Sequence, residues 1–168
     1  MIRSELARFD GRSVSVLEGI LRDHDPPGTA LIDAVLDAMR DDETLVQAGA
    51  SWLLRETLAR GCVLDDAQLD RLAGALEHTH DGFGRLHLCQ ALRHLRVPER
   101  HAEPFAVFLR ECLSSDNTFL RAWAPDGLFR LAEQHERFLG EATAAVEAAL
   151  SDPAASVRAR ARRTLRGE

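Results

Sequence analysis

One motif recurs four times along this chain at an almost constant spacing. Its last copy runs from Ser151 to Leu165 and reads SDPAASVRARARRTL, and the same frame begins again at Asp41, Asp81 and Ser115. The copies are 38, 36 and 37 residues apart, counted between the equivalent positions Gln47, Arg85, Arg121 and Arg158. A fixed period in this range is typical of stacked supersecondary units, because one unit alone cannot bury its apolar face. The chain is therefore expected to fold as a stack of repeats.

Each copy predicts a turn followed by an amphipathic helix. In the last copy, Asp152 marks the turn, and Val157, Ala161 and Leu165 lie four residues apart on one helix face. Further amphipathic segments lie between the copies, so the chain reads as outer helices that alternate with inner helices. The outer helices are expected at residues 29–40, 65–78, 99–113 and 137–150, and the inner helices at 44–60, 83–96, 117–134 and 154–166.

Local signals refine these helices. Gly61 is placed to end one helix and Asp65 to cap the next. Pro125 and Gly127 lie in the middle of residues 117–134, which predicts a kink or a break there. The residues expected to be buried between helix pairs share one stripe on the inner helices: Val46, Ala50, Leu54, Leu88, Leu92, Leu120, Leu128, Val157, Ala161 and Leu165.

An Asp in the turn followed by Val-Arg-x-x-x-Ala-x-x-x-Leu resembles HEAT repeats, and most closely the short bacterial, phycobilisome-lyase-like kind. The copy with Asp152, Val157 and Arg158 matches this pattern best, whereas the first copy has Gln47 in place of the Arg. The resemblance covers residues 29–166 and implies that the motif's Asp and Arg link neighbouring repeats. It implies an all-α fold, a right-handed α-solenoid of the HEAT/armadillo-like type. Residues 1–168 then form a single domain with an N-terminal cap at 1–24 and repeats at 29–60, 65–96, 99–134 and 137–166.

Composition restricts the partners and the compartment. Hydrophobic residues make up 45% of the 168 residues, enough for a core, and the net charge of −6 disfavours a general nucleic-acid binder or an anionic membrane surface. All 21 basic residues are Arg, which is typical of a GC-rich genome. Three cysteines without a CxxC pair predict free, mostly buried thiols in a reducing cytoplasm. No segment has the apolar length of a secretion signal or a membrane span, so a cytoplasmic protein is expected.

A helical wheel of the inner helices predicts one free surface opposite the buried stripe. In a HEAT-type stack this surface is concave. The inner helices carry a net charge of +9 and the rest of the chain −15, so the surface is expected to be basic. The predicted partner-binding residues on it are Trp52, Arg55, Gln90, Arg93, Asp126, Phe129, Arg163 and Arg166.

Catalytic and metal-binding patterns are weak. His87 and His94 share a helix face, but seven residues of helix separate them by about 10.5 Å, too far for one ion. No nucleophile motif, phosphate loop or metal-ligand spacing occurs, so no catalytic residue, metal or cofactor is predicted. One HEAT-like family excises alkylated bases with Trp, Asp and Arg side chains, and Trp52, Trp123, Asp126 and Arg163 supply these residue types.

The sequence therefore predicts a non-enzymatic protein–protein interaction module, an adaptor or an inhibitor or immunity-type protein. Its concave surface is expected to bind an acidic segment of a protein partner, because Arg pairs with carboxylates in a bidentate manner. The alternative is a nucleic-acid-binding or DNA glycosylase-type protein. The sequence leaves the oligomeric state open.

Overall fold

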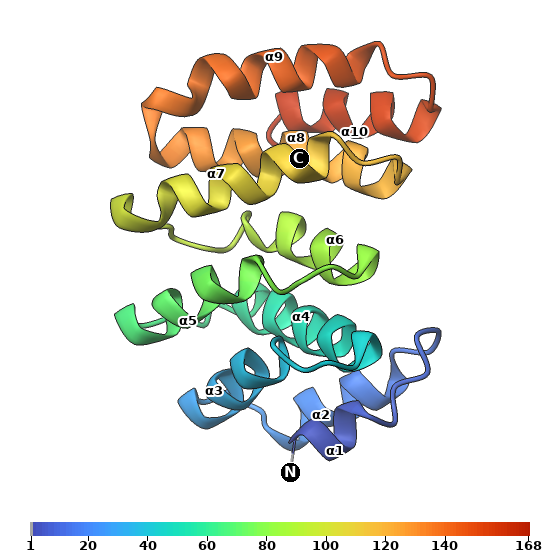
Figure 1. The fold of residues 1–168 in the computed structure, drawn as a ribbon, viewed down its shortest axis with the longest axis vertical. Coiled ribbons are helices and arrows are strands. Elements are labelled where there is room, and N and C mark those ends of the chain that lie inside the picture. The colour runs from blue at the N-terminus through green and yellow to red at the C-terminus, as the bar shows by residue number, and fades with distance from the viewer. Residues whose placement is uncertain (1) are drawn as a thin grey trace.

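The computed structural model describes residues 2–168, and this range contains ten α-helices, one 3-10 turn and no strand. The predicted all-α class is therefore confirmed. The helices follow one another along the long axis of the molecule, from α1 and α2 at one end to α9 and α10 at the other (Figure 1). Their bounds are α1 Ile2–Leu6, α2 Ser15–Asp23, α3 Thr29–Ala38, α4 Thr44–Ala59, α5 Asp66–Leu76, α6 Gly82–Ala91, α7 Glu99–Leu113, α8 Thr118–Gln134, η1 Glu136–Phe138, α9 Leu139–Leu150 and α10 Ala155–Leu165.

The helix ends follow the local sequence signals. Asp65 accepts a hydrogen bond from the backbone N–H of Gln68, and the Gln68 side chain accepts one from the Asp65 backbone, forming a capping box at the start of α5. Gly61 follows α4 with a φ of 89°, a left-handed conformation that favours glycine. Asp81 caps α6 through the N–H of Gly84. Both capping predictions, for Gly61 and Asp65, are confirmed.

The helices pack in two rows. Helices α4, α6, α8 and α10 contact one another in sequence and form what is called here the inner row, and α3, α5 and α7 form the outer row. Helix α3 packs on α4, α7 packs on α8, and α9 contacts both α8 and α10. Helices α1 and α2 pack against α4 at one end of the row. Side chains on successive helices of the inner row therefore lie close to one another.

The predicted stripe of buried residues is confirmed for nine of its ten members, from Val46 to Ala161. They lie in a core that extends from Ile2 to Ala142 and in a smaller cluster between α8, α9 and α10. The prediction is wrong for Leu165, which is 57% exposed. Leu165 ends α10, and none of the described helices packs beyond α10 to cover it.

Two predicted helices differ from the structure. The inner helix expected at residues 83–96 ends at Ala91, because Gln134 bonds the backbone of the segment that follows: its Nε2 donates to the Leu95 carbonyl at 3.1 Å, and its Oε1 accepts from the Val97 N–H at 2.9 Å. A kink or a break is predicted near Pro125, and the break is absent, because helix α8 is continuous from Thr118 to Gln134. Helices α6, α7, α9 and α10 all pack on α8, and this packing outweighs the one backbone hydrogen bond that a proline removes.

Candidate functional site

The structure places the eight predicted surface residues on the inner row or directly after its helices. Trp52 and Arg55 lie on α4, Gln90 on α6, and Arg93 two residues beyond α6. Arg55 Nη1 donates to Gln90 Oε1 at 2.6 Å, and the Arg55 guanidinium lies over the Trp52 ring at 5.7 Å. Side chains from neighbouring helices of the row therefore meet. The remaining four residues are Asp126 and Phe129 on α8, Arg163 on α10 and Arg166 after it.

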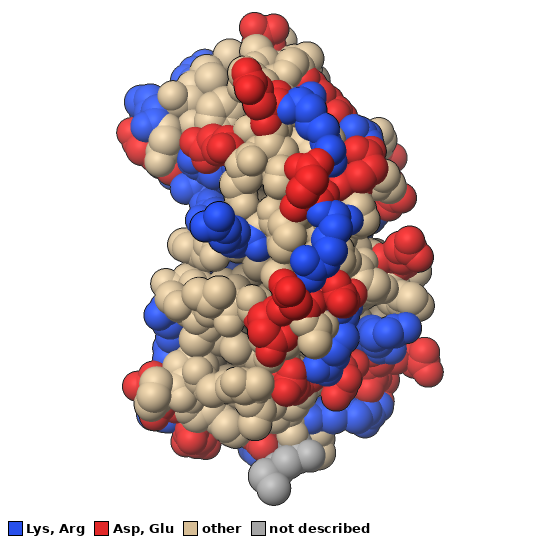
Figure 2. All heavy atoms as spheres, turned by 90° about the vertical axis from the view of Figure 1, so that its left-hand side faces the viewer, with Lys and Arg blue, Asp and Glu red and all other residues tan. Residues whose placement is uncertain are grey.

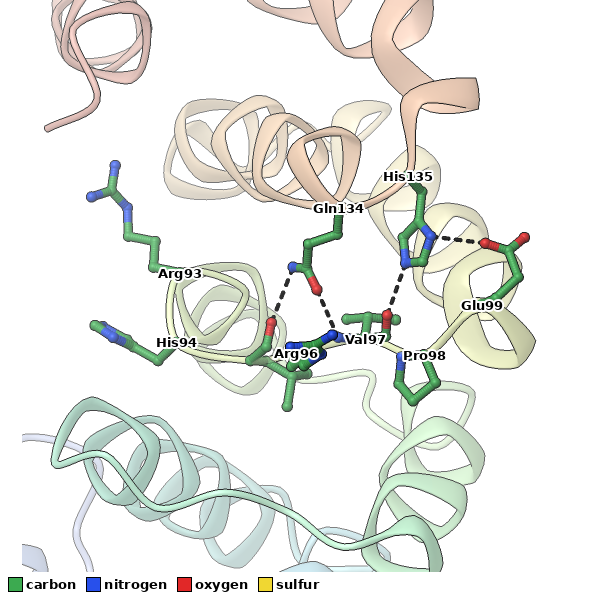
Figure 3. Close-up of a pocket in the computed structure, with 9 residues that line it drawn as sticks. Arg93, His94, Arg96, Val97, Pro98, Glu99, Gln134 and His135 are labelled. Atoms are coloured by element: carbon green, nitrogen blue, oxygen red, sulfur yellow. Dashed lines mark hydrogen bonds and ion pairs between the residues drawn. The ribbon is translucent and has the colours of Figure 1, made fainter.

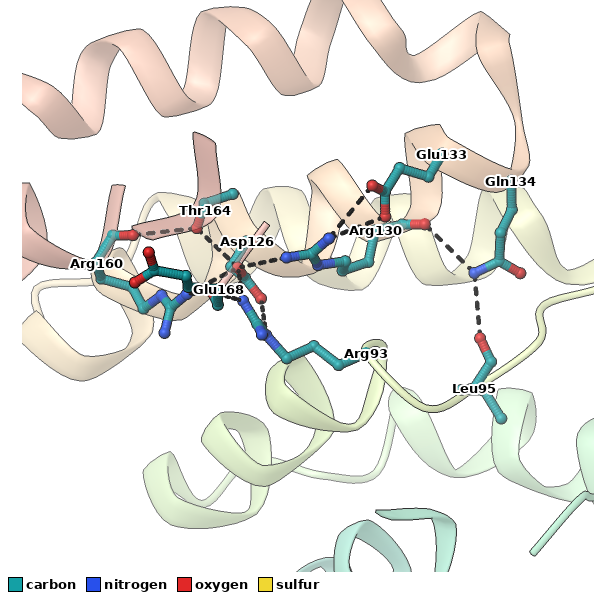
Figure 4. Close-up of polar contacts among 9 residues, drawn as sticks. All are labelled: Arg93, Leu95, Asp126, Arg130, Glu133, Gln134, Arg160, Thr164 and Glu168. Atoms are coloured by element: carbon teal, nitrogen blue, oxygen red, sulfur yellow. Dashed lines mark hydrogen bonds and ion pairs between the residues drawn. The ribbon is translucent and has the colours of Figure 1, made fainter. Parts of the chain in front are cut away.

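Asp126 does not line a free surface, so its prediction as an exposed site residue is wrong. Its side chain is 0% exposed. Helix α8 lies between α6 and α10, and Asp126 is enclosed by side chains that reach it from both neighbours (Figure 4). An ionised carboxylate is costly to bury without partners, so the groups that contact Asp126 determine its role.

Two partners hold the Asp126 carboxylate. Arg93 binds it in a bidentate manner, with Nε 2.9 Å from Oδ2 and Nη2 2.7 Å from Oδ1. The Thr164 hydroxyl donates to Oδ1 at 2.7 Å. These contacts join the end of α6, the middle of α8 and the last turn of α10. The buried carboxylate thus links three segments of the inner row through hydrogen bonds.

Two further guanidinium groups surround the same carboxylate. Arg160 Nη2 lies 3.5 Å and Arg130 Nη2 3.9 Å from Asp126 Oδ1. Two cations lie near the Trp123 ring, with the Arg160 guanidinium 4.5 Å and the Arg93 guanidinium 5.7 Å from its centre. We refer to Arg93, Arg130 and Arg160 around Asp126 as the arginine cluster.

Positive charge in the arginine cluster exceeds negative charge. Three guanidinium groups surround one buried carboxylate, and Arg130 also pairs with Glu133, whose side chain is half exposed. Arg130 Nε, Arg130 Nη2 and Arg160 Nε are buried without a hydrogen-bond acceptor. Burial lowers the pKa of Arg160, and the neighbouring arginines lower it further, against the opposing effect of Asp126. Buried donors without acceptors are costly, so this cluster is suited to take up an additional anion.

Arginines on the outer helices are fully matched by acids. Arg71 binds both Asp33 at 2.8 Å and Asp37 at 2.7 Å, and Arg110 binds both Glu103 and Glu141 at 2.6 Å. Figure 2 shows basic and acidic side chains alternating in a band beside a face that is hollowed at mid-height. The arginine cluster therefore differs from the outer-helix arginines, because its guanidinium groups outnumber the carboxylates that contact them.

The backbone oxygen of Glu168 contacts the arginine cluster. It accepts hydrogen bonds from Arg93 Nη2 and from Arg160 Nη2 (Figure 4). Gly167 has a φ of 76°, and the Gly167 and Glu168 N–H groups donate to the Thr164 and Arg163 carbonyls, so the chain turns back over the cluster after α10. An oxygen acceptor therefore already occupies a position shared by two guanidinium groups.

A hollow of about 650 Å³ adjoins the arginine cluster. Arg93 and Gln134 line it together with His94 and Arg96, whose side chains are exposed (Figure 3). On its far side, His135 Nε2 lies 2.8 Å from the Val97 carbonyl and its Nδ1 lies 2.8 Å from Glu99. The hollow thus offers a polar entrance with free basic side chains next to Arg93.

The other predicted site residues lie around this centre. Phe129 is half-buried, with the Arg130 guanidinium 5.9 Å from its ring. Arg163 and Arg166 are exposed, and Arg166 pairs with Glu168 at 2.8 Å. The helical wheel did not select Trp123, Arg130, Arg160 or Thr164 as surface residues. Arg160 occupies the same place in its repeat as Trp123, three residues after the first apolar position, so the repeat frame itself contained the missing signal.

Neither a membrane span nor a metal cluster is found in the described part of the chain. No helix within residues 2–168 is both long and apolar enough to cross a bilayer. Across the same residues, no three His, Cys, Asp or Glu side chains are grouped so that they could hold a metal ion. Cys62, Cys89 and Cys112 are free thiols, and the last two are buried.

Comparisons with protein-family models, with curated proteins and with solved structures found no match to this chain.

Proposed function

We propose that this chain is a HEAT-like, right-handed α-solenoid and that it acts as a protein-interaction module. Contacts of the motif residues support the repeat assignment. Arg121 Nε donates to Asp152 Oδ2 at 2.9 Å, from one repeat to the next. Gln47, which replaces the motif Arg in the first copy, donates to the backbone carbonyls of Asp41 and His78, and so also bridges two repeats. The inner row then forms the concave surface of the solenoid.

The ligand of this surface, in our proposal, is an acidic segment of a partner protein. One observation carries the proposal: the arginine cluster holds three guanidinium groups around one carboxylate and retains buried donors without acceptors. An acidic side chain would supply the acceptors, and Arg–carboxylate hydrogen bonds are among the stronger polar contacts. Arg96 and Arg163, both exposed, would hold neighbouring acids of the same segment, and Trp52 would supply apolar contact area.

A DNA glycosylase-type function is less well supported. A catalytic carboxylate must reach the substrate or its attacking water within hydrogen-bond distance. Asp126 is fully buried, and Arg93 and Thr164 already occupy both of its oxygens. Binding of nucleic acid without catalysis is opposed by the net charge of −6. We therefore favour an adaptor or inhibitor role in the cytoplasm.

Fluorescence anisotropy with a labelled Glu-rich peptide tests this function. We expect saturable binding to the Glu-rich peptide, and little binding to a Gln-rich peptide of equal length or to single-stranded DNA. The double variant Arg96→Glu/Arg163→Glu should weaken peptide binding at least about tenfold, because two exposed guanidinium groups become carboxylates. Both side chains are exposed, so the fold should persist.

The matched control is Arg22→Glu/Arg40→Glu, which makes the same charge change on α2 and just after α3, away from the arginine cluster. It should bind the Glu-rich peptide like the parent. Equal binding by both double variants would exclude the inner row as the site. Tighter binding to DNA than to the peptide would favour the nucleic-acid alternative.

A further inference from the structure

Guanidinium groups outnumber acidic groups in the arginine cluster, and three of its donor atoms lack an acceptor. Three guanidinium groups carry three positive charges, and Asp126 supplies one buried negative charge. Glu133 contacts Arg130 only through Nη1, with its side chain half exposed, and leaves Arg130 Nε and Nη2 without an acceptor. Asp126 and Glu133 together supply two negative charges, so one further negative charge would balance the three guanidinium groups. The three donors without an acceptor, Arg130 Nε, Arg130 Nη2 and Arg160 Nε, could take up three acceptor oxygens.

The Glu168 backbone oxygen marks where an oxygen of such a ligand can lie. Arg93 and Arg160 both donate to this oxygen. The oxygen is held there by a short turn at Gly167 and Glu168, and both of these residues are exposed. A turn of this kind can be displaced without disturbing the core, since its side chains bury no apolar surface.

We propose that the arginine cluster binds a phosphoryl group, carried by a phosphorylated side chain in the acidic segment of the partner. This inference rests on the proposed function and names the chemistry of its ligand. The phosphoryl group displaces the Gly167–Glu168 turn, and one of its oxygens takes the position of the Glu168 backbone oxygen. Arg93 and Arg160 donate to that oxygen, and Arg130 donates to another.

The number and the geometry of acceptor oxygens favour a phosphoryl group over a carboxylate. A phosphorylated side chain carries about −1.5 to −2 charges at neutral pH and three strong acceptor oxygens, against one charge and two oxygens for a carboxylate. Arginine clusters opposite phosphoryl groups are a recurring mode of phosphopeptide recognition, because the planar guanidinium matches phosphate oxygens in a bidentate manner. Here Arg130 lies on α8, Arg160 on α10 and Arg93 after α6, so the three guanidinium groups reach the ligand from more than one direction.

Trp123 offers a direct readout of binding. Its ring contacts the guanidinium groups of Arg160 and Arg93, and the chain has only one other tryptophan, Trp52 on α4. In a Trp52→Phe background, Trp123 is the single indole. Titration with inorganic phosphate at constant ionic strength should change its fluorescence in a saturable manner. Acetate should need at least about ten times the concentration for the same effect, because it offers only two acceptor oxygens.

Two variants separate the arginine cluster from a general effect of anions. Arg160→Gln should raise the apparent Kd for phosphate at least about tenfold. Arg55→Gln is the matched control: Arg55 lies on the same row and next to the other tryptophan, but Gln90 and Glu56 already satisfy it. Arg55→Gln should bind phosphate like the parent. Thermal unfolding shows whether each variant is folded, and Arg130→Gln replaces Arg160→Gln if the latter is not.

The variant Gly167→Pro tests the position of the site, because proline cannot adopt the φ of 76° that the turn requires. Displacing the competing backbone oxygen should lower the Kd for phosphate by a few-fold, and a phosphoserine peptide rich in Glu should bind more tightly than the same peptide with serine. An absent or non-saturable response, equal affinity for acetate, or an unchanged Kd in Arg160→Gln would overturn the phosphoryl site. If phosphate binds as expected but no acidic peptide does, the arginine cluster stands as a phosphate site and the proposed peptide function fails. Binding of the unphosphorylated peptide with no phosphate response overturns this inference alone.

Discussion

At the scale of single residues, burial separates positions that the repeat pattern treats as equivalent. Leu92 and Leu165 both belong to the predicted stripe, yet Leu92 is 2% exposed and Leu165 is 57% exposed. Leu92→Ala removes packed methyl groups from the core and should lower the free energy of unfolding by about 2–5 kcal/mol. Leu165→Ala should lower it by less than about 0.5 kcal/mol. Urea unfolding of both variants measures the difference, and equal effects would contradict the burial assigned to them.

His87 makes a testable contribution to the pH dependence of stability. It lies between α4 and α6 with Nδ1 3.0 Å from Ser51 Oγ. Burial, with a further effect of the Arg55 charge, lowers the pKa of His87 to about 4 from its usual 6.5. The unfolded chain therefore binds this proton more readily than the folded chain. Stability from His87 is complete above about pH 6.5 and is lost as the pH falls toward 4, by roughly 3 kcal/mol at most.

The comparison with His87→Gln isolates this contribution. Acids such as Asp152, whose pKa is lowered by Arg121 and by the Ala154 N–H, also lose stability in acid, but they do so equally in both proteins. The difference in unfolding free energy between parent and variant should therefore shrink between pH 7 and pH 4. A difference that stays constant over this range would show that His87 does not titrate in a buried state.

The sequence assigns most residues to a position in the recurring motif. It does not distinguish a side chain on a free surface from one that is enclosed between neighbouring helices. The wheel put Arg55 and Gln90 together, and they do meet. It gave Asp126 the same outward direction, although α6 and α10 approach closely enough for Arg93 and Thr164 to enclose it. A wheel describes one helix at a time. Which side chains from neighbouring helices reach across depends on the separation of those helices, which the sequence pattern does not contain.

At the scale of elements, α8 shows how close approach between helices constrains single positions. A Cβ atom at Gly127 would lie 2.8 Å from Leu109 Cδ2 and 3.2 Å from the Cys89 carbonyl oxygen. Gly127→Ala should therefore destabilise the protein by about 1–3 kcal/mol, although alanine favours helix formation. A Cβ atom at Gly74, within α5, would meet nothing from neighbouring elements within 4 Å, so Gly74→Ala should stabilise by about 0.5–1 kcal/mol. Thermal unfolding distinguishes the signs, and stabilisation by both would contradict tight packing at α8.

The sequence predicted where helices begin better than where they end or continue. Asp65 and Asp81 cap α5 and α6 through side-chain chemistry that is local and therefore readable. The end of α6 at Ala91 depends instead on Gln134, a residue of another repeat that bonds Leu95 and Val97. The continuity of α8 through Pro125 likewise depends on the helices packed around it. Contacts between helices that are distant in the sequence therefore determine where α6 ends and why α8 continues through Pro125.

At the scale of the whole molecule, the arginines fall into two groups. Those on the outer helices pair with acidic side chains, whereas those of the arginine cluster outnumber the carboxylates around them. Ion pairs join the outer helices to helices that neighbour them in the structure, as those of Arg71 and Arg110 do. Exposed pairs of this kind contribute little to stability individually. The arginine cluster is different, because its single carboxylate is buried and joins α8 to the chain after α6 and to the last turn of α10. The stability of α10 should therefore depend on Asp126 more than on any surface ion pair.

Substitution of Asp126 tests this dependence. Asp126→Asn leaves three guanidinium groups without a buried counter-charge, which should cost about 3 kcal/mol or more. Helix α10 packs on α8 and α9 and not on α3 or α4, so the loss should appear locally. Hydrogen exchange should accelerate at least about tenfold in α10 and stay nearly unchanged in α3 and α4. Asp37→Asn, which removes an exposed partner of Arg71, should change the free energy of unfolding by less than about 1 kcal/mol. If Asp126→Asn instead accelerated exchange equally in all ten helices, the molecule would unfold as one cooperative unit, and the carboxylate would stabilise the whole molecule rather than α10 alone.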